Sequence, residues 1–205
     1  MMLLLPFRKI RLFAAAAVLA IAPVSNIHAE PIPLPTVDFE ARAKFISGGE
    51  LLMRHSGGKT RIEMELPGAG IPITGIVDLK RKKIVFTVPI PGQTNTVVEA
   101  DLGDDAAFGQ IVGQGERIGN SIVAGEPCTL WKIKSEHGTA VACLSRDNIP
   151  LKTEATIDGK TQIVFEVTSI KRVPQNPADF ELPPGAKVIK LPKGFKGVPG
   201  VPGLN

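Results

Sequence analysis

Cysteine and histidine are scarce in this chain. Its 205 residues include two cysteines, Cys128 and Cys143, and three histidines. One histidine lies in a predicted leader, which leaves His55 and His137, and these do not combine with the cysteines in the spacing of a zinc site. The sequence therefore predicts no metal site and no cofactor.

Recognisable catalytic motifs are missing as well. The chain has no G-x-S-x-G elbow, no H-E-x-x-H pair, no phosphate-binding loop and no dinucleotide fingerprint. Neither His55, at a strand end, nor His137, in a tight turn, has an acid set beside it by local geometry, so we interpret both as surface or rim histidines. Asp104 and Asp105 could bind a cation, but acids in the first turn of a helix already have a structural role. We expect no enzymatic activity; a His55 beside an acid inside a pocket would favour the opposite.

Long apolar runs are confined to the first 29 residues. Arg8, Lys9 and Arg11 precede an apolar stretch from Leu12 to Val24, and Ala29 ends the segment with a small residue. This pattern predicts a signal peptide, residues 1–29, and export to the periplasm. The alternative is a membrane anchor, but the stretch is shorter than the ~18 residues that a spanning helix needs. We predict a soluble periplasmic product with no transmembrane segment after cleavage.

The chain without its predicted leader also lacks a sizeable net charge. The formal net charge of the whole chain is +4, and three of these charges come from the leader. A nearly neutral domain with few aromatic residues does not favour nucleic-acid binding. The basic cluster from Lys80 to Lys83 could contact phosphate or acidic lipid, but between two strands it is more typical of a solvated turn.

Both cysteines and the only tryptophan, Trp131, occur between residues 126 and 147. Two β-rich runs flank the turn signal from Ser135 to Gly138, which predicts a hairpin. If Lys134 faces Thr139, Trp131 and Ile133 lie on one face, which we predict to be the core face, and both cysteines lie on the other.

In this register the cysteines are diagonal neighbours, roughly 7 Å apart, which is long for a disulfide. A bulge near Pro127 could shorten the distance. We predict a structural disulfide in an oxidising compartment rather than a redox pair, because the C-x-x-C spacing that lowers a thiol pKa is absent.

Alternating patterns predict a chain of antiparallel strands. Between Thr36 and Ile46, five apolar residues alternate with charged ones, which is typical of a strand with one buried face. Further strands are predicted at 51–55, 60–66, 73–79, 83–88 and 93–99, then at 151–157 and 160–173 with Ile163, Phe165 and Val167 on one face. Residues 101–112 are the best helix candidate. Residues 191–205 are predicted to form a disordered, Pro- and Gly-rich tail.

These elements predict a mainly β domain at residues 30–190, built on a curved antiparallel sheet that forms an open half-barrel lidded by loops and a short helix. One helix is too little cover for a continuous apolar face. The face must therefore close on itself, be covered by loops, or receive an apolar guest. The alternative to a cavity is a core that the protein's own side chains fill completely.

Three segments carry a resemblance to a known family: residues 124–131, AGEPCTLW; residues 143–151, CLSRDNIPL; and residues 174–185, PQNPADFELPPG. They resemble exported bacterial proteins of unassigned function in the lipoprotein-localisation (LolA/LolB-like) superfamily. The resemblance implies a half-open antiparallel barrel with helical and loop lids, and a hydrophobic cavity that in the best-known members shields lipoprotein acyl chains.

Two function hypotheses follow. The first is a periplasmic binding module that holds an acyl chain, lipid or lipoprotein segment in the half-barrel. Its predicted ligand contacts are Phe39, Phe45, Ile62, Met64, Phe86, Trp131, Ile133 and Phe165. The second is an envelope protein-interaction or sensor domain that binds no small ligand and uses a sheet edge or the Pro-rich tail.

Overall fold

The computed structural model describes residues 29–45, 48–66, 70–87, 95–102, 113–135, 138–157 and 159–191. The leader up to residue 28, most of the predicted helix (103–112) and the predicted tail from residue 192 lie outside these ranges, as does His137.

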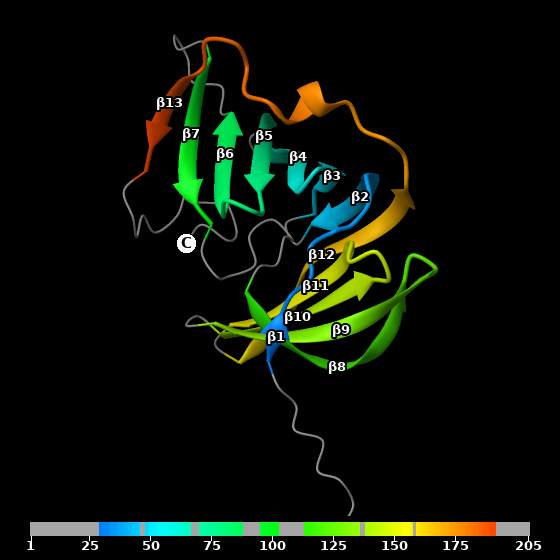
Figure 1. Ribbon diagram of the computed structural model, residues 1–205. Coiled ribbons are helices and arrows are strands. Elements are labelled where there is room, and N and C mark those ends of the chain that lie inside the picture. The colour runs from blue at the N-terminus through cyan, green and yellow to red at the C-terminus, as the bar shows by residue number, and fades with distance from the viewer. Residues whose placement is uncertain are drawn as a thin grey trace, which may run out of the picture.

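The described residues form a single thirteen-stranded sheet in the order β1-β8-β9-β10-β11-β12-β2-β3-β4-β5-β6-β7-β13 (Figure 1). Every neighbouring pair is antiparallel except β7 and β13, which are parallel. The strands are β1 (Glu30–Pro31), β2 (Phe39–Phe45), β3 (Glu50–Ser56), β4 (Lys59–Leu66), β5 (Ile71–Asp78), β6 (Lys83–Thr87), β7 (Thr96–Asp101), β8 (Gln114–Val123), β9 (Glu126–Ser135), β10 (Gly138–Ser145), β11 (Pro150–Ile157), β12 (Lys160–Lys171) and β13 (Lys187–Lys190).

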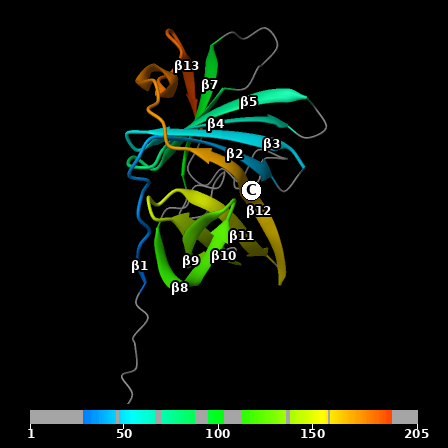
Figure 2. The ribbon, with the colours of Figure 1, turned by 90° about the vertical axis from the view of Figure 1, so that its right-hand side faces the viewer.

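The sheet is strongly curved. In Figure 2, β8 to β12 form a trough below β2 to β5, and β12 passes from one part to the other, where it pairs with β2. Because the sheet does not close, β8 with the short β1 lies at one end and β13 at the other. The prediction of a mainly β, open half-barrel is therefore confirmed.

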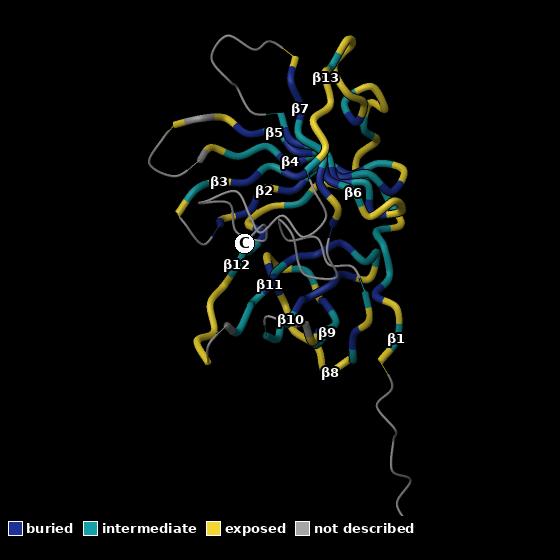
Figure 3. Tube along the Cα trace, turned by 90° about the vertical axis from the view of Figure 1, so that its left-hand side faces the viewer, coloured by how far each residue is buried: buried dark blue, intermediate teal, exposed yellow. Residues whose placement is uncertain are grey.

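Strand β2 shows how the sequence produces the buried face. Phe39, Ala41, Ala43 and Phe45 are each at most 5% exposed, while the residues between them are half-buried or exposed. Side chains on a strand alternate between faces, so four apolar residues at a spacing of two give one apolar face. The main core forms where these residues meet the buried side chains of β3 to β6 and of β11 and β12. Figure 3 shows exposed residues along β8 and β13 instead.

Strand β12 departs from the predicted alternation. Phe165 and Val167 are buried, as predicted, but Ile163 is 43% exposed. The register with β11 shifts between Thr153 and Glu154, so Val164 is an extra residue on β12. A bulge of this kind reverses the alternation, and Val164 packs against the core in place of Ile163.

The segment after β12 covers the outer face of β4. It contains a 3-10 helix, η1 (Pro177–Phe180), whose Phe180 is buried. Lys59 donates to the carbonyl of Phe180 at 3.3 Å, and Arg61 donates to the carbonyl of Asp179 at 3.0 Å. The predicted basic turn is also present, with Lys80, Arg81 and Lys82 exposed. Among the described residues, no helix is both long enough and apolar enough to cross a membrane.

Candidate functional site

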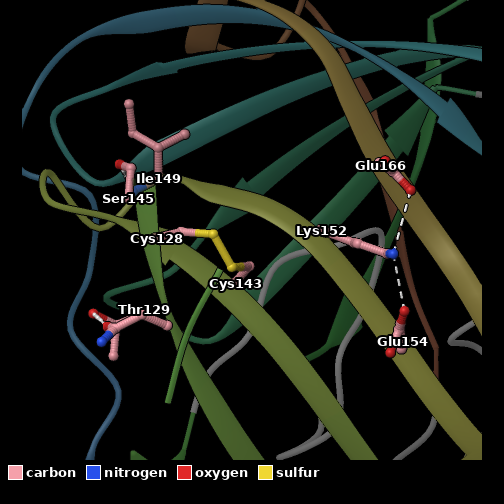
Figure 4. Close-up of a disulfide and its surroundings, with 9 residues drawn as sticks. Cys128, Thr129, Cys143, Ser145, Ile149, Lys152, Glu154 and Glu166 are labelled. Carbon is pink, nitrogen blue, oxygen red and sulfur yellow. Dashed lines mark hydrogen bonds and ion pairs between the residues drawn. A yellow bond between two sulfur atoms is a disulfide. The ribbon is translucent and has the colours of Figure 1, made fainter. Parts of the chain in front are cut away.

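The β9–β10 hairpin has the predicted register. Lys134 is opposite Thr139, and pairing continues without a shift to Cys128 opposite Ser145. The Cα atoms of Cys128 and Cys143 are 5.4 Å apart and the two residues form a disulfide (Figure 4). The predicted separation of roughly 7 Å and the bulge near Pro127 are therefore wrong. Strand twist brings one diagonal pair closer than a flat ladder does, and the nearest bulge is instead between β10 and β11, beside Cys143.

Both faces of this hairpin carry buried residues, and the face predicted to be the core face belongs to the smaller of two buried clusters. Cys128 and Cys143 belong to the main core. Trp131 and Ile133 lie on the opposite face, in a second cluster that contains Ile32 of the N-terminal segment. Trp131 and Ile133 are therefore buried, as predicted, but the main core lies on the cysteine face. The cover over Trp131 comes from Ile32, about a hundred positions away, which strand alternation does not reveal.

The eight predicted ligand contacts do not line one cavity. Phe39, Phe45, Ile62, Phe86 and Phe165 are buried in the main core, and Met64 packs partly buried against it. Trp131 and Ile133 belong to the second cluster. The five members of the main core are each at most 5% exposed, so these side chains fill the interior of the half-barrel. Their role as lipid contacts stays a prediction.

An open edge of the sheet borders the second cluster. Strand β8 has ten residues, but β1 pairs only with Gln114 and Gly115 on its outer side. No other described residue pairs with that side. Ile118 is 47% exposed and Ile122 is 70% exposed. The register with β9 shifts between Arg117 and Gly119, so regular pairing geometry is available from Gly119 to Val123.

A small polar pocket lies beside this edge. Its volume is about 210 Å³, and it is lined by Pro33, Arg117, Thr129, Trp131, Leu144, Ser145, Arg146 and Asn148. The guanidinium carbon of Arg117 lies 4.9 Å from the centre of the Trp131 ring, a cation–π distance. Arg117 Nε also lies 2.7 Å from a carboxylate oxygen of Glu30. We call this the Trp131 pocket.

A larger groove lies at the ends of β2 to β5, with a volume of about 540 Å³. Its lining mixes charged and apolar residues: Arg42, Glu50, Leu51, Leu52, Glu63, Met64, Glu65, Pro72, Ile73 and Thr74. Met64 is the one predicted ligand contact in this groove, and Trp131 is the one in the Trp131 pocket. Among the described residues, no three His, Cys, Asp or Glu side chains are placed to hold a metal ion.

His55 is an interior residue, contrary to its prediction as a surface or rim histidine. It is 2% exposed and stacks on Phe39 with ring centres 5.4 Å apart. Its Nδ1 lies 3.0 Å from the carbonyl oxygen of Val37. Because a carbonyl only accepts, Nδ1 carries the proton, and Nε2 is buried with no partner among the described residues. Burial lowers the pKa of the imidazole, against the opposing effects of the Val37 carbonyl and Asp38.

Sequence reasoning missed the β8 edge. Residues 114–123 include Gly115, Gly119 and the polar pair Asn120 and Ser121, which break the alternation that marks a strand. The available signal was the pair of β-branched residues Ile122 and Val123 directly before the Ala124-Gly125 turn.

Comparison with known proteins gives structural likeness only. No family model matches the chain, and no curated protein matches it. Among solved structures, PNGF-II in space group P21 has a TM-score of 0.51 at 13% identity over 76% of this chain. The same protein in space group C2 has a TM-score of 0.48 at 12% identity over 75%. This chain spans 32% and 30% of the two PNGF-II chains, and the first match shows a shared fold alone.

Two further matches are to MucB in complexes with MucA. The Pseudomonas aeruginosa MucA/MucB complex has a TM-score of 0.42 at 16% identity, over 77% of this chain and 59% of that chain. MucB in complex with MucA(peri) has a TM-score of 0.37 at 16% identity, over 73% and 57%.

Proposed function

We propose that this protein is a protein-interaction module that receives an extended segment of a partner protein on the outer edge of β8. The observation that carries the proposal is the unpaired edge from Gly119 to Val123, with the exposed side chains of Ile118 and Ile122 beside it. An unpaired strand edge presents a row of N–H and C=O groups, which a strand from another chain can complete.

The other end of the sheet contrasts with this edge. Strand β13 has four residues, and lysines, Lys187 and Lys190, stand at both of its ends. Short edge strands and lysines protect a sheet against pairing with another chain. Strand β8 is longer, and its most exposed apolar residue, Ile122, has no such charge beside it on the strand. The two ends of the sheet are therefore not equivalent, and β8 is the better acceptor.

The packed interior favours this function over lipid carriage. A carrier needs a space that its own side chains leave empty. Phe39 and Phe165 are 0% exposed, and Phe45, Ile62 and Phe86 are at most 5% exposed, within the main core. A guest at this place would have to displace those side chains from contacts that already bury them.

The predicted compartment is consistent with this role. The leader at residues 1–29 predicts export, and the disulfide between Cys128 and Cys143 fits an oxidising compartment. The half-open sheet agrees with the LolA/LolB-like resemblance. We therefore propose the periplasm as the place where the partner is met.

A peptide selection tests the proposal with purified protein. Random peptides are selected on the wild type and counter-selected on an Ile118→Lys/Ile122→Lys double variant. We expect enriched peptides with alternating apolar residues that bind the double variant at least tenfold more weakly. Val188→Lys/Ile189→Lys places the same two charges on β13, where these residues are 38% and 40% exposed, and as the matched control it should bind like the wild type. A failure to enrich peptides, or equal affinity for the double variant, contradicts the proposal.

A further inference from the structure

The Trp131 pocket is rich in hydrogen-bond donors. Arg117 and Arg146 both line it, and a guanidinium donates without accepting. The Ser145 side chain, in a residue 3% exposed, accepts from the backbone N–H groups of Asp147 at 3.3 Å and Ile149 at 3.1 Å. Its hydroxyl proton therefore remains available to a ligand. Such a set of donors fits an anionic group better than a neutral one.

The charges in and around the pocket are not balanced. Arg117 has one carboxylate partner, Glu30. Arg146 is 86% exposed and lies 3.8 Å from Asp147, but the second carboxylate oxygen of Asp147 is already bound to Arg172 at 2.6 Å. The two pocket arginines therefore have one carboxylate to themselves, that of Glu30, and share a second, that of Asp147, with Arg172. Arginine binds carboxylate in a planar, two-bonded geometry, so Arg146 is the group best placed to bind an added one.

The size and position of the pocket indicate that the anion is a carboxylate of a bound protein segment. A volume of about 210 Å³ is below the 300–1,000 Å³ of typical small-molecule sites, but it accommodates a single side-chain or terminal carboxylate. The pocket adjoins the β8 edge: Arg117 is a β8 residue, and Thr129 donates at 3.4 Å to the side chain of Asn120 in β8. A strand bound along β8 therefore passes beside it.

We infer that the partner segment carries a carboxylate that docks in the Trp131 pocket, between Arg117 and Arg146. This inference rests on the proposed function for the identity of the ligand, but the pocket can be tested without a partner. The carboxylate belongs either to an acidic side chain or to the C-terminus of the segment. Both present the same chemistry to the two guanidinium groups.

The single tryptophan of the chain provides the test. The indole N–H signal of Trp131 is followed by NMR at pH 7 while acetyl-Glu-amide is added, with acetyl-Gln-amide as the neutral comparison. Acetyl-Ala with a free C-terminus, compared with its amide, presents a terminal carboxylate instead, and the acid that binds more tightly identifies the source of the carboxylate. We expect saturable shifts with the acids and at least tenfold weaker binding, or none, with the amides.

Two variants locate the binding. Arg146→Gln should weaken the response to the acids at least tenfold, because Arg146 is exposed and its loss should not unfold the protein. Arg42→Gln removes an exposed arginine on β2, and as the matched control it should leave the response unchanged. No saturable shift, equal shifts with the amides, or a full response in Arg146→Gln would overturn the inference.

The proposed function and the carboxylate inference can be contradicted independently of each other. Enriched β8-dependent peptides without a required carboxylate would leave the proposed function in place and overturn the inference. A carboxylate response at Trp131 without any β8-dependent peptide would support the anion site and count against strand addition.

Discussion

Acidification is predicted to destabilise the protein through His55. The imidazole is 2% exposed, and its neutral form places the proton on Nδ1, facing the Val37 carbonyl. A second proton must therefore go to Nε2, which has no partner among the described residues. Asp38 favours the charged form and Lys80 opposes it, but the largest effect is burial, which lowers the pKa below its usual value of 6.5.

The direction of the pH effect follows from how the folded and the unfolded protein bind protons. Below the unfolded pKa of about 6.5, the unfolded chain takes up a proton that the folded protein resists, so stability is lost as the pH falls. The full contribution is present at pH 7 and above. Each pH unit between the unfolded and the folded pKa costs at most about 1.4 kcal/mol, so the loss between pH 6.5 and pH 5 has a ceiling of about 2 kcal/mol.

Urea unfolding followed by Trp131 fluorescence measures this loss between pH 7.5 and pH 5. A His137→Gln background removes the other histidine outside the predicted leader, and pH 5 stays above the usual range of carboxylates. His55→Gln in the same background should show a nearly constant free energy of unfolding over this range. An equally constant free energy in the parent, or an unchanged pH dependence in His55→Gln, would refute the reasoning.

Three further predictions follow from burial and pairing. Replacing Cys128 and Cys143 with alanine should lower the free energy of unfolding by about 3 kcal/mol or more, because the disulfide closes a loop of separation 15; the melting temperature by circular dichroism should fall by about 6–12 °C, and an unchanged value would be inconsistent. Phe165→Ala removes a side chain that is 0% exposed and should cost about 3–5 kcal/mol in urea unfolding, whereas a cost below about 1 kcal/mol would show a loosely packed interior. Gly115→Ala places a Cβ 3.2 Å from Ile32 and 3.3 Å from the Lys132 carbonyl oxygen, so it should displace β1 and speed amide exchange near Gln114, and an unaltered exchange rate would argue against the β1 pairing.

The parts of the fold that follow from local pattern were predictable. Strand β2 has four buried residues at a spacing of two, and this spacing is visible in the sequence. The hairpin register also followed from the turn between Ser135 and Gly138, because in a tight hairpin the turn fixes which residues are opposite one another.

The parts that depend on distant segments were not predictable in this way. His55 is buried because Phe39 and Val37 come from the segment that leads into the neighbouring strand. Strand β13 was missed because its parallel pairing with β7 joins residues about ninety positions apart. The β8 edge became visible only once the strand order was known, since no local pattern tells whether a strand has one neighbour or two.

Amide hydrogen exchange along β8 tests the central claim most directly. In the free protein, amides between Gly119 and Val123 that point away from β9 should exchange much faster than those of β9. Addition of a peptide selected on the wild type should protect these β8 amides and leave β3 to β5 unchanged. Slow exchange along all of β8 without a ligand, or protection that appears at the groove of β2 to β5 instead, would contradict a partner strand on this edge.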